Sequence, residues 1–169
     1  LACKRTRGDS HAERLESFYG GQASGYDEFR KRLLTGRKEL MEAMEPRAGE
    51  VWVDMGGGTG ANLEFLGDNL AKLEKLYLVD LTESMLKIAD KRIERNGWTN
   101  VETRQADATT WRPECGSVDA ICFSYSLTMI PDWFAAVDRA YEALKPGGTI
   151  GVVDFYIARK YPSEGRAKQ

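Results

Sequence analysis

The distribution of apolar and polar residues divides the chain into two parts. Across residues 10–45, apolar side chains recur every three or four positions in two stretches, which is the spacing of an amphipathic helix. Gly20-Gly21 separates the two stretches. Pro46 then ends the pattern, because a proline disfavours the helical conformation in the residue before it. We therefore expect an N-terminal helical segment over residues 1–45.

From residue 50 onward, short apolar runs alternate with amphipathic stretches. The apolar runs predict strands over 51–55, 75–80, 100–107, 118–126 and 149–157. The stretches between them predict helices over 61–72, 83–96 and 132–145, the last of which stops at Lys145-Pro146-Gly147-Gly148. This alternation is typical of an α/β fold with a mostly parallel, doubly wound sheet and right-handed crossovers. We assign a Rossmann-like core to residues 46–158 and a tail to residues 159–169.

A glycine-rich loop follows the first predicted strand, where this architecture binds its ligand. Residues 54–61 read DMGGGTGA. A phosphate-binding P-loop is excluded, because Ala61-Asn62 stands where lysine and serine or threonine are required. A dinucleotide fingerprint fits formally as Gly56-x-Gly58-x-x-Ala61, with Asp80 in the position of the ribose-binding acid.

Asp54 favours a different ligand. A carboxylate directly before the loop would repel a pyrophosphate at the helix N-terminus, whereas it would suit a ligand with an ammonium and a sulfonium. The pattern D-x-G-x-G-x-G resembles the loop of Rossmann-like methyltransferases that use S-adenosyl-L-methionine (AdoMet). We expect Asp54, Gly56, Gly58 and Gly60 to bind this cofactor. In the alternative interpretation, Asp54 only orients the loop through its backbone amides.

Two later segments agree with this resemblance. DLTESML at residues 80–86 is similar to a segment of small-molecule methyltransferases in which the acid accepts the ribose hydroxyls and apolar residues flank adenine. The resemblance implies that Asp80, Leu81 and Met85 contact the cofactor, and that Asp107 and Ala108 lie near the adenine amino group. Ser124, at the end of the fourth apolar run, completes the expected cofactor-binding set.

Composition narrows the class of partner only slightly. The 24 lysines and arginines nearly balance the 26 aspartates and glutamates, so the net charge of -2 does not call for nucleic acid. Cys3, Cys115 and Cys122 form no CxxC pair, which is typical of a reducing compartment, and no metal site is suggested. His11, the only histidine, is expected at the surface or in a helix cap rather than as a general base. No apolar stretch reaches transmembrane length, so we expect a soluble protein.

Four blocks of sequence resemble the methyltransferase part of betaine lipid synthases, which make the diacylglyceryl-N,N,N-trimethylhomoserine headgroup. They lie at residues 15–37, 51–66, 122–133 and 151–162. The resemblance implies an N-methyltransferase that acts on the amine of a diacylglyceryl-homoserine lipid. It also implies peripheral contact with the cytoplasmic side of a membrane such as the endoplasmic reticulum, and fusion to an aminocarboxypropyl transferase outside these residues.

We place three aromatic residues, Tyr19, Tyr26 and Tyr125, near the methyl-transfer point. Tyr26 belongs to the N-terminal segment, which crosses the cofactor as a lid in this fold, and the tyrosine rings would favour an ammonium group by cation-π contact. Phe29 from the same segment is expected to pack it onto the sheet. The apolar residues past the fourth strand would face an acyl chain: Met129, Ile130, Pro131, Trp133 and Phe134. Trp133 and Phe134 are explained equally well as part of a helix core.

The chain ends barely past the fifth predicted strand, whereas methyltransferases of this class have seven. We therefore expect a truncated segment of a larger enzyme, with an exposed apolar edge on the fifth strand. Two alternatives remain open. One is an AdoMet-dependent methyltransferase that acts on another small molecule, such as a quinone or sterol. The other is a non-catalytic Rossmann-like binding segment that is inactive through truncation.

Overall fold

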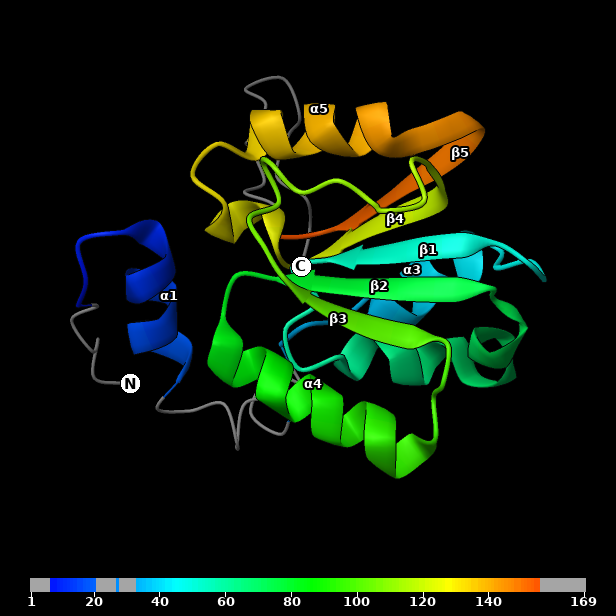
Figure 1. Ribbon diagram of the computed structural model, residues 1–169, viewed down its shortest axis with the longest axis horizontal. Helices are drawn as coiled ribbons and strands as arrows, with labels where there is room; N and C mark the ends of the chain where they lie inside the picture. Colours follow the sequence, from blue (N-terminus) through cyan, green and yellow to red (C-terminus); the bar gives the residue numbers. More distant parts are fainter. Residues whose placement is uncertain (1–6, 21–26, 28–32, 156–169) are drawn as a thin grey trace, which may run out of the picture.

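A parallel five-stranded sheet forms the centre of the molecule. The computed structural model describes residues 7–20, 27 and 33–155. The strand order is β3-β2-β1-β4-β5, and every neighbouring pair is parallel (Figure 1). The strands are β1 (Val51–Met55), β2 (Lys75–Asp80), β3 (Val101–Gln105), β4 (Val118–Ser124) and β5 (Leu144–Val153). This confirms the predicted α/β, Rossmann-like fold.

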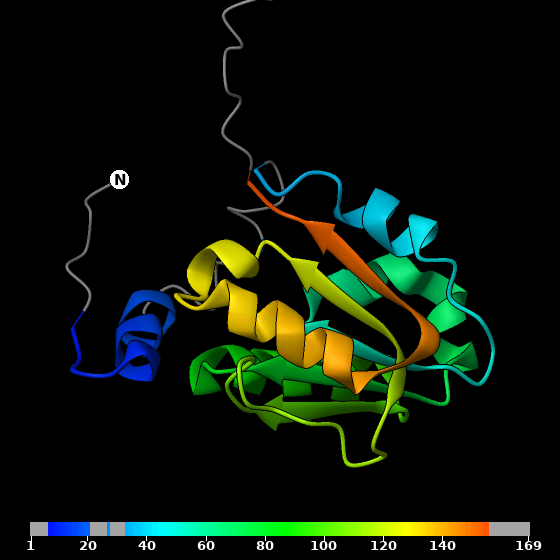
Figure 2. The same ribbon diagram turned by 90° about the horizontal axis from the view of Figure 1, so that it is seen from above.

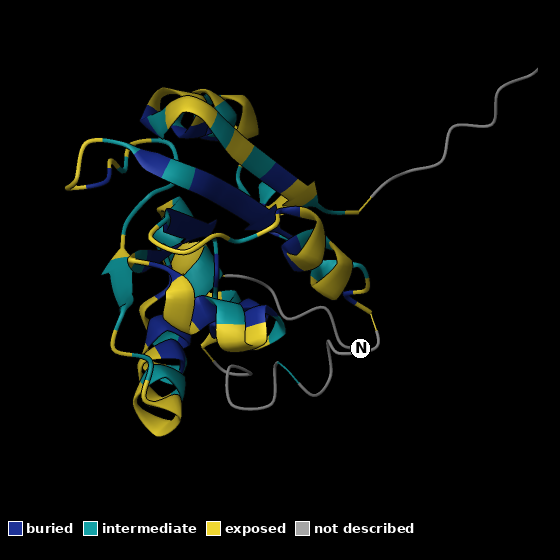
Figure 3. Ribbon diagram, turned by 90° about the vertical axis from the view of Figure 1, so that its right-hand side faces the viewer, coloured by how far each residue is buried: buried dark blue, intermediate teal, exposed yellow. Residues whose placement is uncertain are grey.

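Helices cover both faces of the sheet. One face packs against α3 (Arg37–Ala43), the 3-10 helix η2 (Ala61–Lys72) and α4 (Glu83–Asn96), and the other packs against α5 (Trp133–Ala143). The strand period of two explains the two cores, because Trp52 points into the first and its neighbour Val53 into the second. The central strands are almost entirely buried (Figure 3). Residues of β1 are buried at all five positions, as expected for a strand covered on both faces.

Helix α1 (His11–Tyr19) lies beside this body, next to the start of α4 (Figures 1 and 2). It begins with a capping box, in which the Ser10 hydroxyl accepts a hydrogen bond from the Glu13 amide and the Glu13 carboxylate accepts one from the Ser10 amide. None of its residues is fully buried. Of the predicted N-terminal helical segment, α1 and α3 are therefore helical, while residues 21–26 and 28–32 lie outside the described part.

Several predicted element boundaries are corrected by the structure. The third and fourth strands are shorter than expected, and β5 begins at Leu144 because Lys145-Pro146-Gly147-Gly148 forms a bulge opposite β4 rather than a stop. The predicted helix 61–72 is a 3-10 helix that is broken at Gly67, whose φ of 52° and ψ of −134° are not helical.

The buried face of α5 also differs from the predicted one. The residues that pack on the sheet are Ala136, Ala140 and Ala143. Trp133 and Phe134 are instead 44% and 65% exposed and stack on each other with 3.7 Å between ring centroids. The interpretation of these two aromatics as helix core is therefore wrong.

Among the described residues, no helix combines the length and the apolar character that crossing a bilayer would require. Peripheral membrane contact stays a prediction.

Candidate active site

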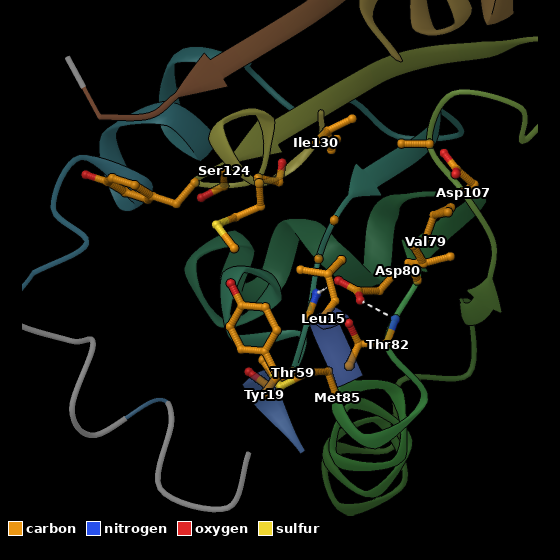
Figure 4. A pocket seen from close by; sticks show the side chains of 18 of the residues that line it. Leu15, Tyr19, Thr59, Val79, Asp80, Thr82, Met85, Asp107, Ser124 and Ile130 are labelled. Carbon is orange, nitrogen blue, oxygen red and sulfur yellow. Dashed lines mark hydrogen bonds between the residues drawn. The ribbon is translucent and has the colours of Figure 1, made fainter. Parts of the chain in front are cut away.

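A cavity of about 270 Å³ opens at the carboxyl ends of the strands. Its walls come from the loops that follow β1, β2, β3 and β4, and α1 closes one side (Figure 4). Carboxyl ends of parallel strands meet at one edge of a sheet, so residues far apart in sequence converge here. The cavity therefore lies where the predicted topology puts its ligand.

The glycine loop forms the floor of the cavity through Gly56 and Gly58. The Gly56 amide donates to the Val79 carbonyl at 2.7 Å, which ties the loop to β2. Gly56 has a φ of 73°, and a Cβ atom there would lie 2.4 Å from the Cβ of Ser126. Only glycine fits without rearrangement, because this close approach leaves no room for a side chain.

Asp80, at the end of β2, holds the loop from the neighbouring strand. Its carboxylate accepts hydrogen bonds from the Gly58 amide at 2.9 Å and from the Thr82 amide at 2.8 Å (Figure 4). Burial raises the pKa of Asp80 above its ordinary value. The predicted cofactor residues Leu81 and Met85 line the cavity beside it. The three residues are thus brought together in one wall of the cavity, and their contact with the cofactor stays a prediction.

Asp107 follows β3 in the same wall of the cavity. Its Oδ1 accepts hydrogen bonds from the amide and the hydroxyl of Thr109, at 2.8 Å and 2.7 Å. This is an Asx turn, which fixes the direction of the carboxylate. Ala108 also lines the cavity. Acids at the ends of two successive strands, β2 and β3, therefore face one space.

Asp54 does not line the cavity, which corrects the expectation of direct contact. It is buried under the loop, where the Asn62 amide donates to its two carboxylate oxygens and the Cys122 thiol donates at 3.3 Å. Burial raises the pKa of Asp54 to about 6. Its position is the one expected in the alternative interpretation, in which Asp54 orients the loop. Asn62 connects Asp54 to the cavity, because Asn62 itself lines the cavity wall. Ser124, whose hydroxyl donates a hydrogen bond to the side-chain oxygen of Asn62, lines the wall as well.

Gly60 differs from the prediction in the same way. A Cβ atom at this position would lie 3.0 Å from Leu78 Cδ1 and 3.1 Å from Leu63 Cδ1. Gly60 is absent from the cavity wall because it faces the core between the loop and the sheet. Its role is close packing, which the third glycine of such loops commonly serves.

The predicted methyl-transfer residues are found in part. Tyr19 lines the cavity from α1, together with Leu15 and His11, which was expected elsewhere. Tyr125 lines it from the end of β4, where its φ of 55° is uncommon for a residue with a side chain. Its hydroxyl donates to the Thr35 carbonyl at 2.7 Å. Tyr26 and Phe29 lie outside the described residues.

A polar network surrounds Thr59 in the glycine loop, and it was not predicted from the sequence. The Thr59 hydroxyl donates to Asp27 Oδ1 at 2.6 Å, and Asp27 also pairs with Arg92 of α4. Arg92 donates to the Thr59 carbonyl as well and lies 3.1 Å from a carboxylate oxygen of Glu64. Arg92 is one of several basic residues on a predicted amphipathic helix, where such residues usually lie at the surface, so no local signal distinguishes it. We call the contacts of Arg92 with Thr59 and Asp27 the Arg92 clamp.

Arg37 lines the cavity from the start of α3. Its Nε donates to the Leu34 carbonyl at 3.1 Å, and its guanidinium lies 5.3 Å from the centroid of the Phe65 ring. These contacts hold a permanent positive charge at the cavity wall.

Comparison with known proteins identifies the family. The model of the ubiE/COQ5 methyltransferase family matches residues 28–162, which is most of the chain. The chain belongs to the ubiE/COQ5 methyltransferase family. This confirms the predicted class, an AdoMet-dependent methyltransferase, but the comparisons do not support the narrower resemblance to betaine lipid synthases.

Curated members of the ubiE/COQ5 family are distant relatives. A demethylmenaquinone methyltransferase of Lactococcus lactis is 26% identical over 147 residues, which covers 84% of this chain and 58% of that protein. The ubiquinone/menaquinone biosynthesis C-methyltransferase UbiE of Escherichia coli is 28% identical over 153 residues, which covers 87% of this chain and 61% of that protein. The chain thus spans about three fifths of the length of these relatives.

Solved structures agree with the observed fold. The complex of DhpI with SAH (S-adenosylhomocysteine) matches with a TM-score of 0.69 and 25% identity, over 95% of this chain and 78% of that one. The YcgJ protein from Bacillus matches with a TM-score of 0.66 and 25% identity, over 72% of this chain and 50% of that one. The cavity suits AdoMet, because bare glycine backbone and the Asp80 carboxylate line it, and a carboxylate is an acceptor for ribose hydroxyls.

Proposed function

We propose that this chain transfers the methyl group of AdoMet to a ring carbon of a small reduced quinone. The observation that carries the proposal is the apolar part of the cavity wall, formed by Leu15 of α1 and by Met129, Ile130 and Pro131 before α5. Such a wall suits a flat, largely apolar acceptor with few polar atoms. The names of the curated relatives, which describe quinone methylation, support the same class of acceptor.

The residues of the chain have separable tasks in this reaction. AdoMet supplies a methyl group that its sulfonium activates for displacement. Gly56, Gly58 and Asp80 would hold the cofactor, with Asp107 on the adenine side. Leu15 and Ile130 would orient the acceptor and exclude water. A displacement of this kind gains most of its rate from positioning and desolvation, so a metal is not needed to explain the rate.

A second acceptor, the amine of a diacylglyceryl-homoserine lipid, is favoured by one observation. The rings of Tyr19 and Tyr125 and the guanidinium of Arg37 line the same cavity. Aromatic rings attract an ammonium group, and an arginine pairs well with a carboxylate, so both charges of a homoserine headgroup would find partners. Under this reading the exposed Trp133 and Phe134 would meet the lipid or a membrane surface.

Product analysis distinguishes the two acceptors. The chain is incubated with isotope-labelled AdoMet and either 1,4-dihydroxynaphthalene or a homoserine-headed diacylglycerol in detergent. We expect label in a carbon-bound methyl group of the naphthalene product. Label in an N-methyl group of the lipid alone would replace the quinone proposal with the betaine one. Binding of S-adenosylhomocysteine without turnover of either probe would favour a non-catalytic binding segment.

A further inference from the structure

One face of α1 points into the cavity. His11, Leu15 and Tyr19 follow one another at intervals of four residues, so they lie on the same side of the helix, and all three line the cavity wall. The last turns of α1 are held to the core where Glu16 accepts a hydrogen bond from the Ser84 amide of α4 at 3.2 Å. Its first turn lies on the side of η3 (Leu127–Met129) (Figure 1). His11 therefore lines the same cavity as Met129 and Ile130, which the proposed function assigns to the acceptor.

The other titratable side chains of the cavity wall already have partners. Among the carboxylates, Asp27 binds Thr59, Asp80 binds Gly58 and Thr82, Asp107 binds Thr109, and Asp132 caps α5 through the Ala135 amide. Arg37 and Tyr125 donate to backbone carbonyls, and Tyr19 makes an interaction of its own. Within the described residues, the imidazole of His11 makes no hydrogen bond or ion pair.

We propose that His11 is the catalytic base, a role that rests on the proposed methyl transfer to a hydroxylated ring. The acceptor hydroxyl gives its proton to an imidazole nitrogen of His11. An electron pair of the ring carbon forms the new bond to the methyl carbon, while the methyl–sulfur bond breaks and its electron pair stays on sulfur. The ring carbon then loses its hydrogen as a proton to water, and the electron pair of that bond restores the aromatic ring and the negative charge on the oxygen. The oxygen takes a proton back from the protonated His11, which returns the imidazole to its neutral form.

The chemistry of the step selects an imidazole. Loss of the hydroxyl proton makes the ring carbon a stronger nucleophile, so a base near neutral pH accelerates the transfer. Imidazole exchanges protons in this range, and a side chain without a fixed partner keeps its lone pair available. The carboxylates of Asp80 and Asp107, in contrast, already accept backbone hydrogen bonds that hold them to their loops.

His11 can be observed without any acceptor, because it is the only histidine of the 169 residues. The untagged chain is titrated by proton NMR while its single imidazole signal is followed, once with S-adenosylhomocysteine and once with AdoMet. The two ligands differ by one methyl group and one positive charge at the methyl-transfer point. A charge that close lowers the titration midpoint of an imidazole by about one pH unit. An equal midpoint in both complexes would overturn the proposal.

The activity measurement uses His11→Gln, with Arg14→Gln on the exposed side of the same helix as the matched control. With 1,4-dihydroxynaphthalene, we expect His11→Gln to lower kcat by about 100-fold, to change the Kd of S-adenosylhomocysteine by less than about threefold, and to lose the acidic limb of the pH profile. Unchanged kcat and pH profile in His11→Gln would reject the base. If the unmutated chain does not methylate this probe, the proposed acceptor class fails, while the NMR midpoints still decide where His11 lies.

Discussion

The side-chain amide of Asn62 donates hydrogen bonds to both carboxylate oxygens of Asp54, at 3.3 Å and 3.0 Å. This pair lies under the glycine loop rather than in the cavity. The carboxylate of Asp54 is nearly inaccessible to solvent, and the nearby Asp80 adds to the effect of burial on its pKa. The glycine loop at the floor of the cavity is therefore supported by a buried acid whose charge depends on pH.

Asp54 makes the stability of the fold depend on pH. Because the pKa of Asp54 is raised to about 6, the folded protein binds this proton more tightly than the unfolded chain does. The contribution of protonated Asp54 to the free energy of unfolding is therefore fully present below pH 4 and is lost as the pH rises through 6. The loss amounts to about 3 kcal/mol, since one pKa unit corresponds to about 1.4 kcal/mol. Urea unfolding of the unmutated chain and of Asp54→Asn, from pH 4 to pH 7, measures it. A stability difference between the two proteins that stays constant with pH would contradict the prediction.

Replacement of Asp80 should weaken cofactor binding. Asp80→Ala removes the acceptor for the Gly58 and Thr82 amides, and it removes the carboxylate that faces the cavity. We expect S-adenosylhomocysteine to bind at least about tenfold more weakly, because one lost charged hydrogen bond costs about 1.5–3 kcal/mol. Calorimetric titration measures the Kd. Asp90→Ala, on the exposed side of α4, is the control and should bind as the unmutated chain does. Equal affinity in Asp80→Ala would argue against the assigned role.

Arg92 is expected to stabilise the glycine loop, whereas its neighbour Arg95 should not. The side chain of Arg92 is 11% exposed and bonds Thr59 and Asp27, while that of Arg95 is 70% exposed. Arg92→Gln leaves the partly buried Asp27 without its cation, so we expect a loss of about 3 kcal/mol in the free energy of unfolding. Arg95→Gln should change it by less than about 0.5 kcal/mol. Thermal unfolding of both variants provides the comparison, and similar losses would show that the clamp is not specific to Arg92.

Gly56→Ala should be destabilising for two reasons that can be separated. The added Cβ meets the Cβ of Ser126 at 2.4 Å, and the φ of 73° is itself unfavourable for alanine. We expect a loss of about 2–3 kcal/mol, of which the double variant Gly56→Ala/Ser126→Gly recovers only the steric part. Denaturant unfolding of the unmutated chain, the two single variants and the double variant forms a complete double-mutant cycle. Simple additivity in that cycle would mean that the close approach to Ser126 is unimportant.

The alternation of apolar runs and amphipathic stretches was sufficient to predict the fold class and the bounds of β1, β2 and α4. These elements have sharp ends in the sequence, because charged residues or glycines directly follow buried runs. The start of β5 could not be predicted in this way. Lys145-Pro146-Gly147-Gly148 is a local stop signal, but the strand continues through a bulge opposite β4, where the Lys145 ammonium pairs with Asp119 at 2.8 Å. Whether the chain stops or continues as a strand here is decided by a contact between residues 26 positions apart, which a local sequence pattern does not contain.

The candidate site shows the same division. Asp80 and Asp107 were predicted because their segments resemble those of AdoMet-dependent methyltransferases, and the parallel strand order brings both to the same edge of the sheet. The burial of Asp54 could also have been predicted from the sequence. Asp54 lies two residues after Trp52, and residues two apart in a strand share a face, so both point to the same buried side of β1. The position of His11 could not be predicted from the sequence, because it depends on how α1 lies against α4. That packing follows from contacts such as the hydrogen bond from the Ser84 amide to Glu16.

The position of β1 at the centre of the sheet has a consequence for how the chain folds. β1 pairs with β2 and also with β4, so Asp54 lies beside Cys122, which is 68 residues further along the chain. Pairings over such separations lose much loop entropy before they gain contacts, and they slow folding. During synthesis, the centre of the sheet cannot close until β4 has left the ribosome. We therefore expect the cavity, which draws residues from positions 11 to 132, to be among the last parts of the molecule to form.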